Sequence, residues 1–186
     1  MLEVLAKHGD TAESWEEPLD PASPFLGRTD FIVSFGYRHI LSNDVLKLFE
    51  KRAINLHISY LPWNRGADPN LWSFLEDTPK GVTIHRVDQG IDTGDILIQR
   101  YVSTLPGDTL RTSYERLTQA MLALFAETWT ELRLDQMSPH PQLPNSGSLH
   151  RSKDKEPYMH FLEQEWDTPV KQLIGKALRR DGEKHA

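Results

Sequence analysis

Apolar and polar side chains alternate between residues 54 and 59. A period of two is typical of a β-strand, and Leu61-Pro62 indicates where this strand ends, because proline cannot donate to the ladder. One face of the strand carries Asn55 and His57. A half-buried strand with a solvated polar face explains this pattern about as well as a functional site does. In the second interpretation, an amide and an imidazole point the same way from a rigid element.

The run Thr29–Phe35 is almost continuously apolar and predicts a strand that is buried on both faces. Ser42 is a candidate N-cap for a helix that continues to Arg52. Strand, helix and strand in close succession predict a βαβ unit, and therefore an α/β fold with a mainly parallel sheet. We expect residues 31–35 and 54–58 to pair in parallel within that sheet. Ligands bind beyond the carboxyl ends of such strands, which places residues 36–41 and 59–66 on one rim.

The remaining pattern predicts two more strands and three more helices. The strands are expected at residues 82–87 and 96–102, where β-branched residues are frequent. Asp68-Pro69 predicts the start of a short helix. A long helix is expected from Thr109 to about Arg133, capped by Asp108, because apolar side chains recur there at helical spacing. A last helix is expected to begin at Asp167-Thr168-Pro169 and to end near Arg180.

Composition narrows the possible functions. The 186 residues suffice for one domain with a sizeable core. The absence of cysteine excludes disulfides and thiolate metal sites, and it suits the cytoplasm. We also predict that no metal ion takes part. No apolar run has the length of a membrane span, so we predict no membrane partner. The net charge of −6 argues against nucleic acid as a partner.

Four short motifs occur in a characteristic order: Asn55-Leu56-His57, Leu61-Pro62, Gly81-Val82-Thr83 and Asp92-Thr93-Gly94. In this order they resemble the formyltransferases that use 10-formyltetrahydrofolate as co-substrate. The resemblance extends from about Asp30 to Leu132, and it implies a Rossmann-like formyltransferase fold. It also implies a catalytic domain over residues 1–135, followed by a C-terminal extension over residues 136–186.

The resemblance implies that Asn55, His57 and Asp92 are catalytic. When an amine attacks a formyl carbon, negative charge develops on the formyl oxygen, which an amide donor and an imidazolium can stabilise. A carboxylate beside the imidazole orients it and raises its pKa. Isolated aspartates in this loop more often cap turns, which is our interpretation of Asp88 and Asp95. We expect His39 and His85 to be structural or peripheral to catalysis.

The family also implies where the folate binds. Members hold the pterin through backbone groups of two segments, which correspond here to Arg38, His39, Ile40 and Leu41, and to Asp88, Gln89, Gly90 and Ile91.

The stretch Trp63–Trp72 is similar to the sugar-nucleotide N-formyltransferases of bacterial glycan or O-antigen pathways, which act on amino-dideoxyhexoses carried by dTDP or another nucleotide. These enzymes are often dimers. The predicted substrate-binding residues are Trp63, Asn64, Arg65, Trp72, His150 and Arg151. Arg65 is the first candidate for the pyrophosphate. Trp63 or Trp72 is the candidate to stack on a base, although core packing explains either tryptophan equally well.

Several alternatives stay open. Methionyl-tRNA formyltransferases carry a further oligonucleotide-binding domain, for which the roughly fifty residues after the long helix are too few. Transfer to glycinamide ribonucleotide is disfavoured by the Trp63–Trp72 stretch. Family members begin with a strand, a helix and a second strand, whereas this chain has no apolar strand before Phe31. We therefore expect a chain shortened at its N-terminus, and a non-catalytic relative is a further possibility.

Overall fold

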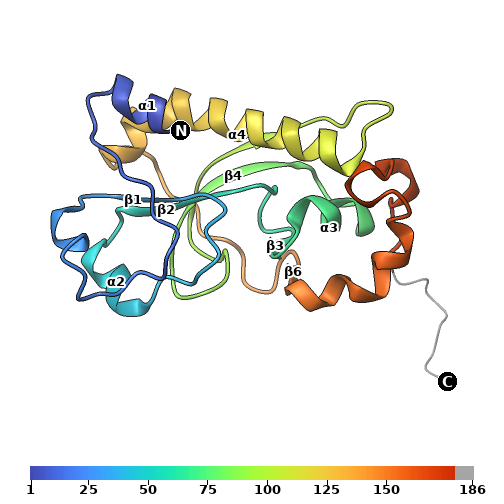
Figure 1. Cartoon of the computed structure of the whole chain (residues 1–186), viewed down its shortest axis with the longest axis horizontal. Helices are drawn as coiled ribbons and strands as arrows, with labels where there is room; N and C mark the ends of the chain where they lie inside the picture. Colours follow the sequence, from blue (N-terminus) through green and yellow to red (C-terminus); the bar gives the residue numbers. More distant parts are fainter. Residues whose placement is uncertain (179–186) are drawn as a thin grey trace.

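The computed structural model describes residues 1–178. Its central sheet has four strands in the order β1-β2-β4-β5 (Figure 1): β1 is Ile32–Ser34, β2 Ala53–His57, β4 Gly81–Arg86 and β5 Ile96–Tyr101. The α/β class is confirmed, and β1 pairs with β2 in parallel as predicted. The prediction of a mainly parallel sheet is wrong, because β2 with β4 and β4 with β5 are antiparallel. The physical reason is that no helix crosses over between β4 and β5, so β5 returns directly beside β4.

One face of the sheet is covered by α4, Leu110–Arg133, which runs across the top of Figure 1 with α1, Leu2–Lys7, at its end. The apolar side chains of β2 and β4 meet α4 in the main core cluster. The cluster contains Ile54, Leu56, Val82, Ile84, Leu117, Met121, Leu124, Phe125, Trp129 and Leu132. The polar face of β2 is therefore turned away from α4, because successive side chains of a strand point to opposite faces.

On the other side, α2, Asn43–Leu48, packs beneath the first two strands. Val45 and Phe49 share a second cluster with Leu26, Leu41 and Ala53. Ser42 is the N-cap, as predicted, and its hydroxyl accepts a hydrogen bond from the Val45 N–H. The helix ends at Leu48 and does not reach Arg52, because Lys51 has a positive φ of 61° that closes a turn into β2.

The C-terminal part of the described chain packs back on the first part. Strand β3, Arg65–Gly66, pairs in parallel with β6, Leu149–His150. Helix α3, Pro69–Leu75, begins at Asp68-Pro69 as predicted. It shares a third core cluster with Val170 and Leu173. This arrangement brings residues near 150 next to residues near 66, which matters for the site.

Two predicted helix features are wrong. The N-cap of α4 is Thr109, which exchanges hydrogen bonds with Thr112. Asp108 instead binds the guanidinium of Arg116 through both carboxylate oxygens, at 2.7 Å each. The expected last helix consists of short 3-10 turns, of which η4 is Val170–Gln172. Its predicted end near Arg180 lies outside the described residues.

Three further 3-10 segments connect the elements: η1, Leu26–Arg28, η2, Ser152–Phe161, and η3, Glu165–Asp167. Over residues 1–178, no helix is both long and apolar enough to span a membrane. The same residues contain no group of three or more His, Cys, Asp or Glu side chains arranged to hold a metal ion.

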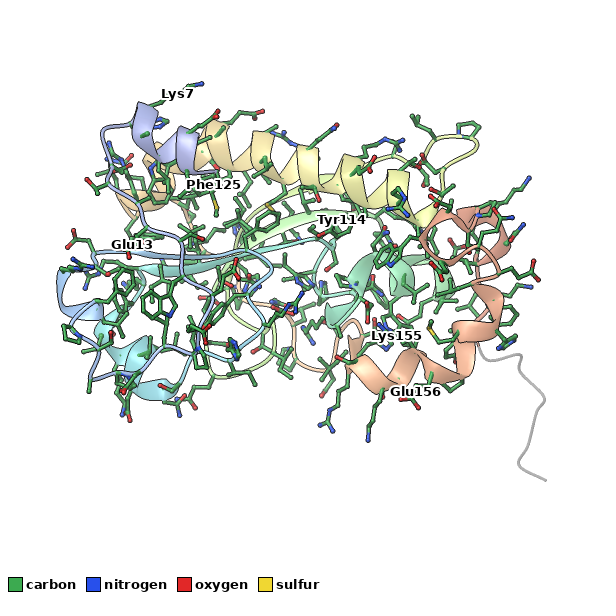
Figure 2. All side chains as sticks on the ribbon, in the orientation of Figure 1. Lys7, Glu13, Tyr114, Phe125, Lys155 and Glu156 are labelled. Atoms are coloured by element: carbon green, nitrogen blue, oxygen red, sulfur yellow. The ribbon has the colours of Figure 1, made fainter. Side chains whose placement is uncertain are left out.

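Replacing Phe125 by alanine should lower the free energy of unfolding by about 3–5 kcal/mol. Phe125 has no exposed surface and lies on the side of α4 that faces the sheet (Figure 2), so the truncation leaves a cavity in the main core. Denaturant titration measures the loss. Glu131→Ala, at an exposed position of the same helix, should change the free energy by no more than about 0.5 kcal/mol. Equal effects of the two substitutions would contradict this description of the core.

Candidate active site

The polar face of β2 continues across the sheet. In the antiparallel pairing of β2 with β4, Asn55 lies opposite His85 and His57 opposite Thr83. Directly opposed residues of two strands point to the same face. The imidazole of His85 therefore lies beside the Asn55 amide, with Asn55 Nδ2 at 3.3 Å from His85 Nε2. Register alone therefore brings four polar side chains to one face of the sheet: Asn55, His57, Thr83 and His85.

Asp92 lies at the centre of this group. It belongs to the loop between β4 and β5 and has a left-handed φ of 52°. One carboxylate oxygen accepts from Asn55 Nδ2 at 2.9 Å, and the other accepts from the Gly66 N–H at 2.8 Å. Gly66 has a φ of 85°, and a Cβ there would lie 2.2 Å from the His150 carbonyl oxygen. Only glycine fits this approach, so Gly66 is required for its N–H to reach Asp92.

The predicted convergence of Asn55, His57 and Asp92 is confirmed by these distances, since His57 Nδ1 lies 3.5 Å from Asp92 Oδ2. Burial favours the neutral form of Asp92. The charges and hydrogen bonds of His57, His85 and the Gly66 N–H outweigh it and hold the pKa of Asp92 below its ordinary value. The carboxylate is therefore ionised at neutral pH.

His57 is 7% exposed and lies between two acceptors. Its Nε2 is 3.0 Å from the Asn64 carbonyl oxygen, on the side of the ring away from Asp92. Burial lowers the pKa of His57 below its ordinary value, although Asp92 and the Asn64 carbonyl pull it upward. Both ring nitrogens thus face groups that would stabilise an imidazolium as soon as it forms.

His85 is the residue that the sequence prediction missed. Its Nδ1 lies 2.7 Å from the Arg86 carbonyl oxygen, and its Nε2 lies 3.3 Å from Asn55 Nδ2. His85 also lies 3.4 Å from Asp92 Oδ1. We expected His85 to be structural or peripheral to catalysis; its contacts with Asn55 and Asp92 show that it is not peripheral, and they agree with a structural role beside the site. Thr83 and His85 are two residues apart and therefore point to the same face of β4. This pattern could have indicated His85 only once β4 was known to pair with β2.

Behind His57 is a polar network that the sequence did not reveal. Asn64 is fully buried, with Nδ2 bound to Glu76 and Oδ1 bound to Thr78. Ser148 donates to Glu76 Oε2 at 2.7 Å and accepts from the Asn64 N–H. Asn64, predicted to contact substrate, therefore takes its side-chain partners from the protein. The structure places it behind His57, where its carbonyl positions the ring.

The other predicted substrate residues fall into two places. Trp63 is 37% exposed near the end of β2. The guanidinium of Arg65 donates to Gln142 Oε1 at 2.8 and 3.0 Å, and Gln142 in turn donates to the Asp92 and Gly94 carbonyls. Arg65 is therefore held against the loop that carries Asp92.

The remaining three lie further along, at β6 and α3. Trp72 is 3% exposed and stacks on the His150 ring at 3.7 Å. The Arg151 side chain is exposed, and its main-chain N–H donates to Asp154.

The two predicted folate segments lie on exposed loops over a shared core. Ile40 is 82% exposed and Ile91 is 42% exposed. Beneath them, Leu41 and Val87 belong to the same apolar cluster. Asp88 shapes its own loop by accepting from the Gly90 N–H and the Thr93 hydroxyl, which agrees with its interpretation as a loop-capping residue. Arg38, His39, Gln89 and Gly90 are exposed.

Comparison with known proteins places this geometry in a family. Residues 25–128 match the family model described as formyl transferase. A methionyl-tRNA formyltransferase of Anaeromyxobacter dehalogenans is 36% identical over 148 residues, which are 79% of this chain and 46% of that protein. The chain spans about half the length of this curated relative.

Solved structures of formyltransferases match as well. The formyltransferase PseJ from Anoxybacillus kamchatkensis is 55% identical, with a TM-score of 0.91, over 95% of this chain and 93% of that one. It was solved in complex with UDP-4,6-dideoxy-4-formamido-L-AltNAc and tetrahydrofolate. A sugar N-formyltransferase from a Shewanella species is 26% identical, with a TM-score of 0.65, over 73% of this chain and 56% of that one. With a polar cluster centred on Asp92 and a family model that covers more than half of its residues, the chain belongs to the formyl transferase family.

Proposed function

We propose that this protein transfers a formyl group from 10-formyltetrahydrofolate to the amino group of a nucleotide-linked amino-dideoxy sugar. The observation that carries the proposal is the ionised Asp92 carboxylate, held beside His57 and Asn55. The acceptor class is supported by PseJ, whose complex contains a formamido sugar on UDP. For this reason we propose UDP as the carrier rather than the dTDP considered from the sequence.

Each catalytic residue has its own role toward the acceptor amine. Asn55 Nδ2 donates to Asp92 and lies 3.3 Å from His85 Nε2, so the Asn55 donor predicted for the formyl oxygen is already engaged within the protein. Its carbonyl oxygen remains to accept a hydrogen bond from the attacking amine and to orient it. The amine attacks the formyl carbon and the bond from that carbon to N10 of the folate breaks; the proton that the amine loses passes by way of Asp92, directly or through one water, to N10, so that none remains on Asp92. His57 lies between the Asn64 carbonyl and Asp92, and as an imidazolium held by these two acceptors it stabilises the negative charge that develops on the formyl oxygen.

The folate would be held by the backbone of residues 38–41 and 88–91, with the exposed Ile40 and Ile91 side chains as apolar contacts. When bound, 10-formyltetrahydrofolate supplies the formyl group. For the acceptor we propose Trp63 and Arg65 next to the reaction site, where Arg65 can exchange its contact with Gln142 for an anionic oxygen.

The cellular setting belongs to the same proposal. A nucleotide-linked formamido sugar is a building block for glycan or O-antigen synthesis, which we propose as the pathway, in the cytoplasm where folate and nucleotide sugars are available. We further propose a homodimer, and a catalytic unit that ends near residue 135 with the extension completing the acceptor side.

A comparison of acceptors tests the function. The full chain should release tetrahydrofolate from 10-formyltetrahydrofolate when a UDP-linked 4-amino-dideoxy sugar is supplied, and the initial rate is followed by folate absorbance. Methionyl-tRNA and glycinamide ribonucleotide, the acceptors of the alternative enzymes, should give no rate above background. A rate with methionyl-tRNA and none with the sugar nucleotides would overturn the proposal.

A further inference from the structure

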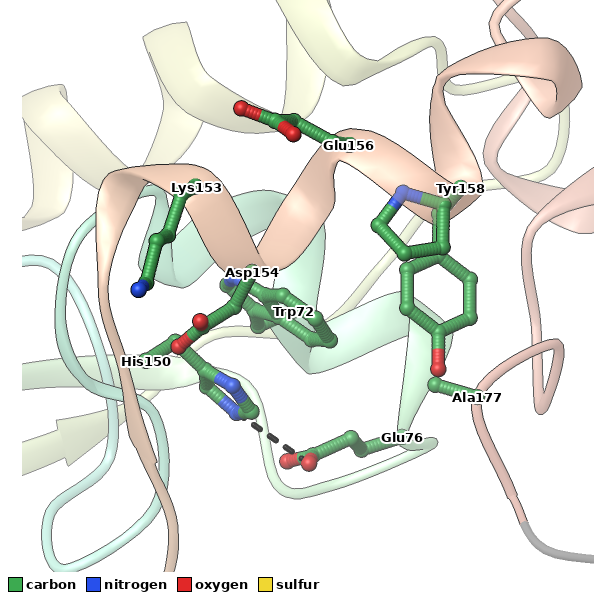
Figure 3. A pocket seen from close by; sticks show the side chains of 9 residues that line it. Trp72, Glu76, His150, Lys153, Asp154, Glu156, Tyr158 and Ala177 are labelled. Atoms are coloured by element: carbon green, nitrogen blue, oxygen red, sulfur yellow. Dashed lines mark ion pairs between the residues drawn. The ribbon is translucent and has the colours of Figure 1, made fainter.

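A cavity of about 510 Å³ is lined by residues of α3, β6 and the 3-10 segment η2 (Figure 3). We call it the side pocket and define it by Trp72, Glu76, His150, Lys153, Asp154 and Tyr158. Its volume lies within the range of small-molecule sites, roughly 300–1,000 Å³. None of the catalytic assignments above uses it.

The side pocket has an aromatic corner. The rings of Trp72 and His150 are stacked at 3.7 Å with only 5° between their planes. The Tyr158 ring stands at 76° to Trp72, with the centroids 5.4 Å apart. Figure 3 shows Tyr158 beside the stacked pair, with Glu76 across the opening from it. Two preformed planes at a steep angle suit a flat ring, which can lie against one plane and meet the edge of the other.

The polar groups of the side pocket include donors without good acceptors. Trp72 Nε1 and His150 Nε2 are buried and lack a well-aligned hydrogen-bond partner among the described residues. His150 Nε2 does lie 3.1 Å from Glu76 Oε1, so it makes an ion-pair contact in poor alignment. Lys153 is exposed at the rim, and no carboxylate within residues 1–178 forms an ion pair with it. A ligand with ring carbonyls and an anionic group would satisfy such donors.

The side pocket and the reaction site share a wall. His150 is the register partner of Gly66, whose N–H donates to Asp92 at 2.8 Å. Glu76 binds the Asn64 side chain, and the Asn64 carbonyl contacts His57. A molecule anchored in the side pocket is therefore separated from Asp92 and His57 by one strand residue or one buried side chain.

We propose that the side pocket binds the nucleoside diphosphate end of the acceptor. The pyrimidine base lies in the corner formed by His150, Trp72 and Tyr158, and Lys153 faces the phosphates. The amino sugar at the other end of the same molecule then extends past Gly66 to Asp92. This inference rests on the proposed function, since it names the subsite that recognises the carrier of the sugar.

Calorimetric titration of the full chain with UDP alone tests the inference. Wild-type protein should bind UDP, and Tyr158→Ala and Lys153→Ala should each weaken binding about tenfold, which corresponds to about 1.4 kcal/mol for the lost stacking or charge contact. Trp72 is avoided because it belongs to the core. Matched controls are Tyr114→Ala, which removes a 44%-exposed tyrosine from α4, and Lys7→Ala on α1. Both controls should bind UDP as the wild type does. Tetrahydrofolate binding, measured in parallel, should be unchanged in all four variants.

These outcomes distinguish failure of the side-pocket assignment from failure of the proposed function. If UDP does not bind the wild type, or binds Tyr158→Ala and Lys153→Ala with wild-type affinity, the side-pocket assignment is overturned even when formyl transfer is observed. If both substitutions weaken UDP binding but no amino-sugar nucleotide is formylated, the side pocket is supported and the proposed reaction fails.

Discussion

Replacing Asp92 by asparagine should reduce the turnover of formyl transfer by about a hundredfold to a thousandfold. The carboxylate accepts from Asn55 Nδ2 and from the Gly66 N–H, and it faces His57. An asparagine has nearly the same shape, but its NH2 group would face either the Asn55 amide N–H or the Gly66 N–H, both of which are donors. It also lacks the charge and the basicity that removal of a proton from the amine requires. Steady-state turnover at saturating folate measures the loss.

The control for this substitution is Asp95→Asn, in the same loop. The Asp95 backbone carbonyl accepts from the Arg86 N–H, and none of the hydrogen bonds or ion pairs described here involves the Asp95 carboxylate. Asp95→Asn should retain wild-type turnover, and both variants should unfold at temperatures close to that of the wild type. Full activity in Asp92→Asn would remove Asp92 from the mechanism.

The second large effect is expected at His57. His57→Gln should lower turnover by on the order of a hundredfold, with a much smaller change in tetrahydrofolate affinity, because the ring acts on developing charge rather than on binding. The exposed His160→Ala serves as the control for loss of an imidazole. A larger effect on folate affinity than on turnover would assign His57 to binding instead.

His57 also has a pH signature. Because burial lowers its pKa in the folded state, the unfolded chain binds this proton first as the pH falls below about 6.5. The wild type should therefore lose stability as the pH decreases below that value, and His57→Gln should lose less over the same range. Asp92 contributes to folding stability in the opposite way, because its ionised form is the one favoured in the folded state. Its lowered pKa stabilises the folded state above about pH 4 and is lost only at lower pH. Melting temperatures across a pH series separate the two.

Side-chain periodicity was sufficient to predict the parts of the fold that depend on neighbours in sequence. The alternation around Asn55 and His57 predicts the polar face of β2, and the apolar stripe of α4 predicts the main core. Ser42 and Pro69 mark helix starts because capping is local. Asp92 could be assigned only through the family resemblance, since a lone loop aspartate resembles many others.

Features that depend on distant pairing were not predictable. His85 enters the site because the antiparallel register places it opposite Asn55, thirty residues away. The network of Asn64, Glu76 and Ser148 joins segments that are up to 84 residues apart. No local pattern records either arrangement. The same limit explains why the strand direction of β4 was wrong: composition shows that a strand exists but not which way it returns.

Mass spectrometry of a UDP-linked 4-amino-dideoxy sugar, after incubation with the protein and 10-formyltetrahydrofolate, shows whether this protein formylates a nucleotide-linked amino sugar. With wild-type protein, the sugar nucleotide should gain one formyl group on its amino nitrogen, and fragmentation should locate that group on the sugar. With Asp92→Asn under the same conditions, the unmodified amine should remain. An unmodified sugar nucleotide after incubation with folded, folate-binding wild-type protein would contradict the account, as would equal formylation by the two proteins.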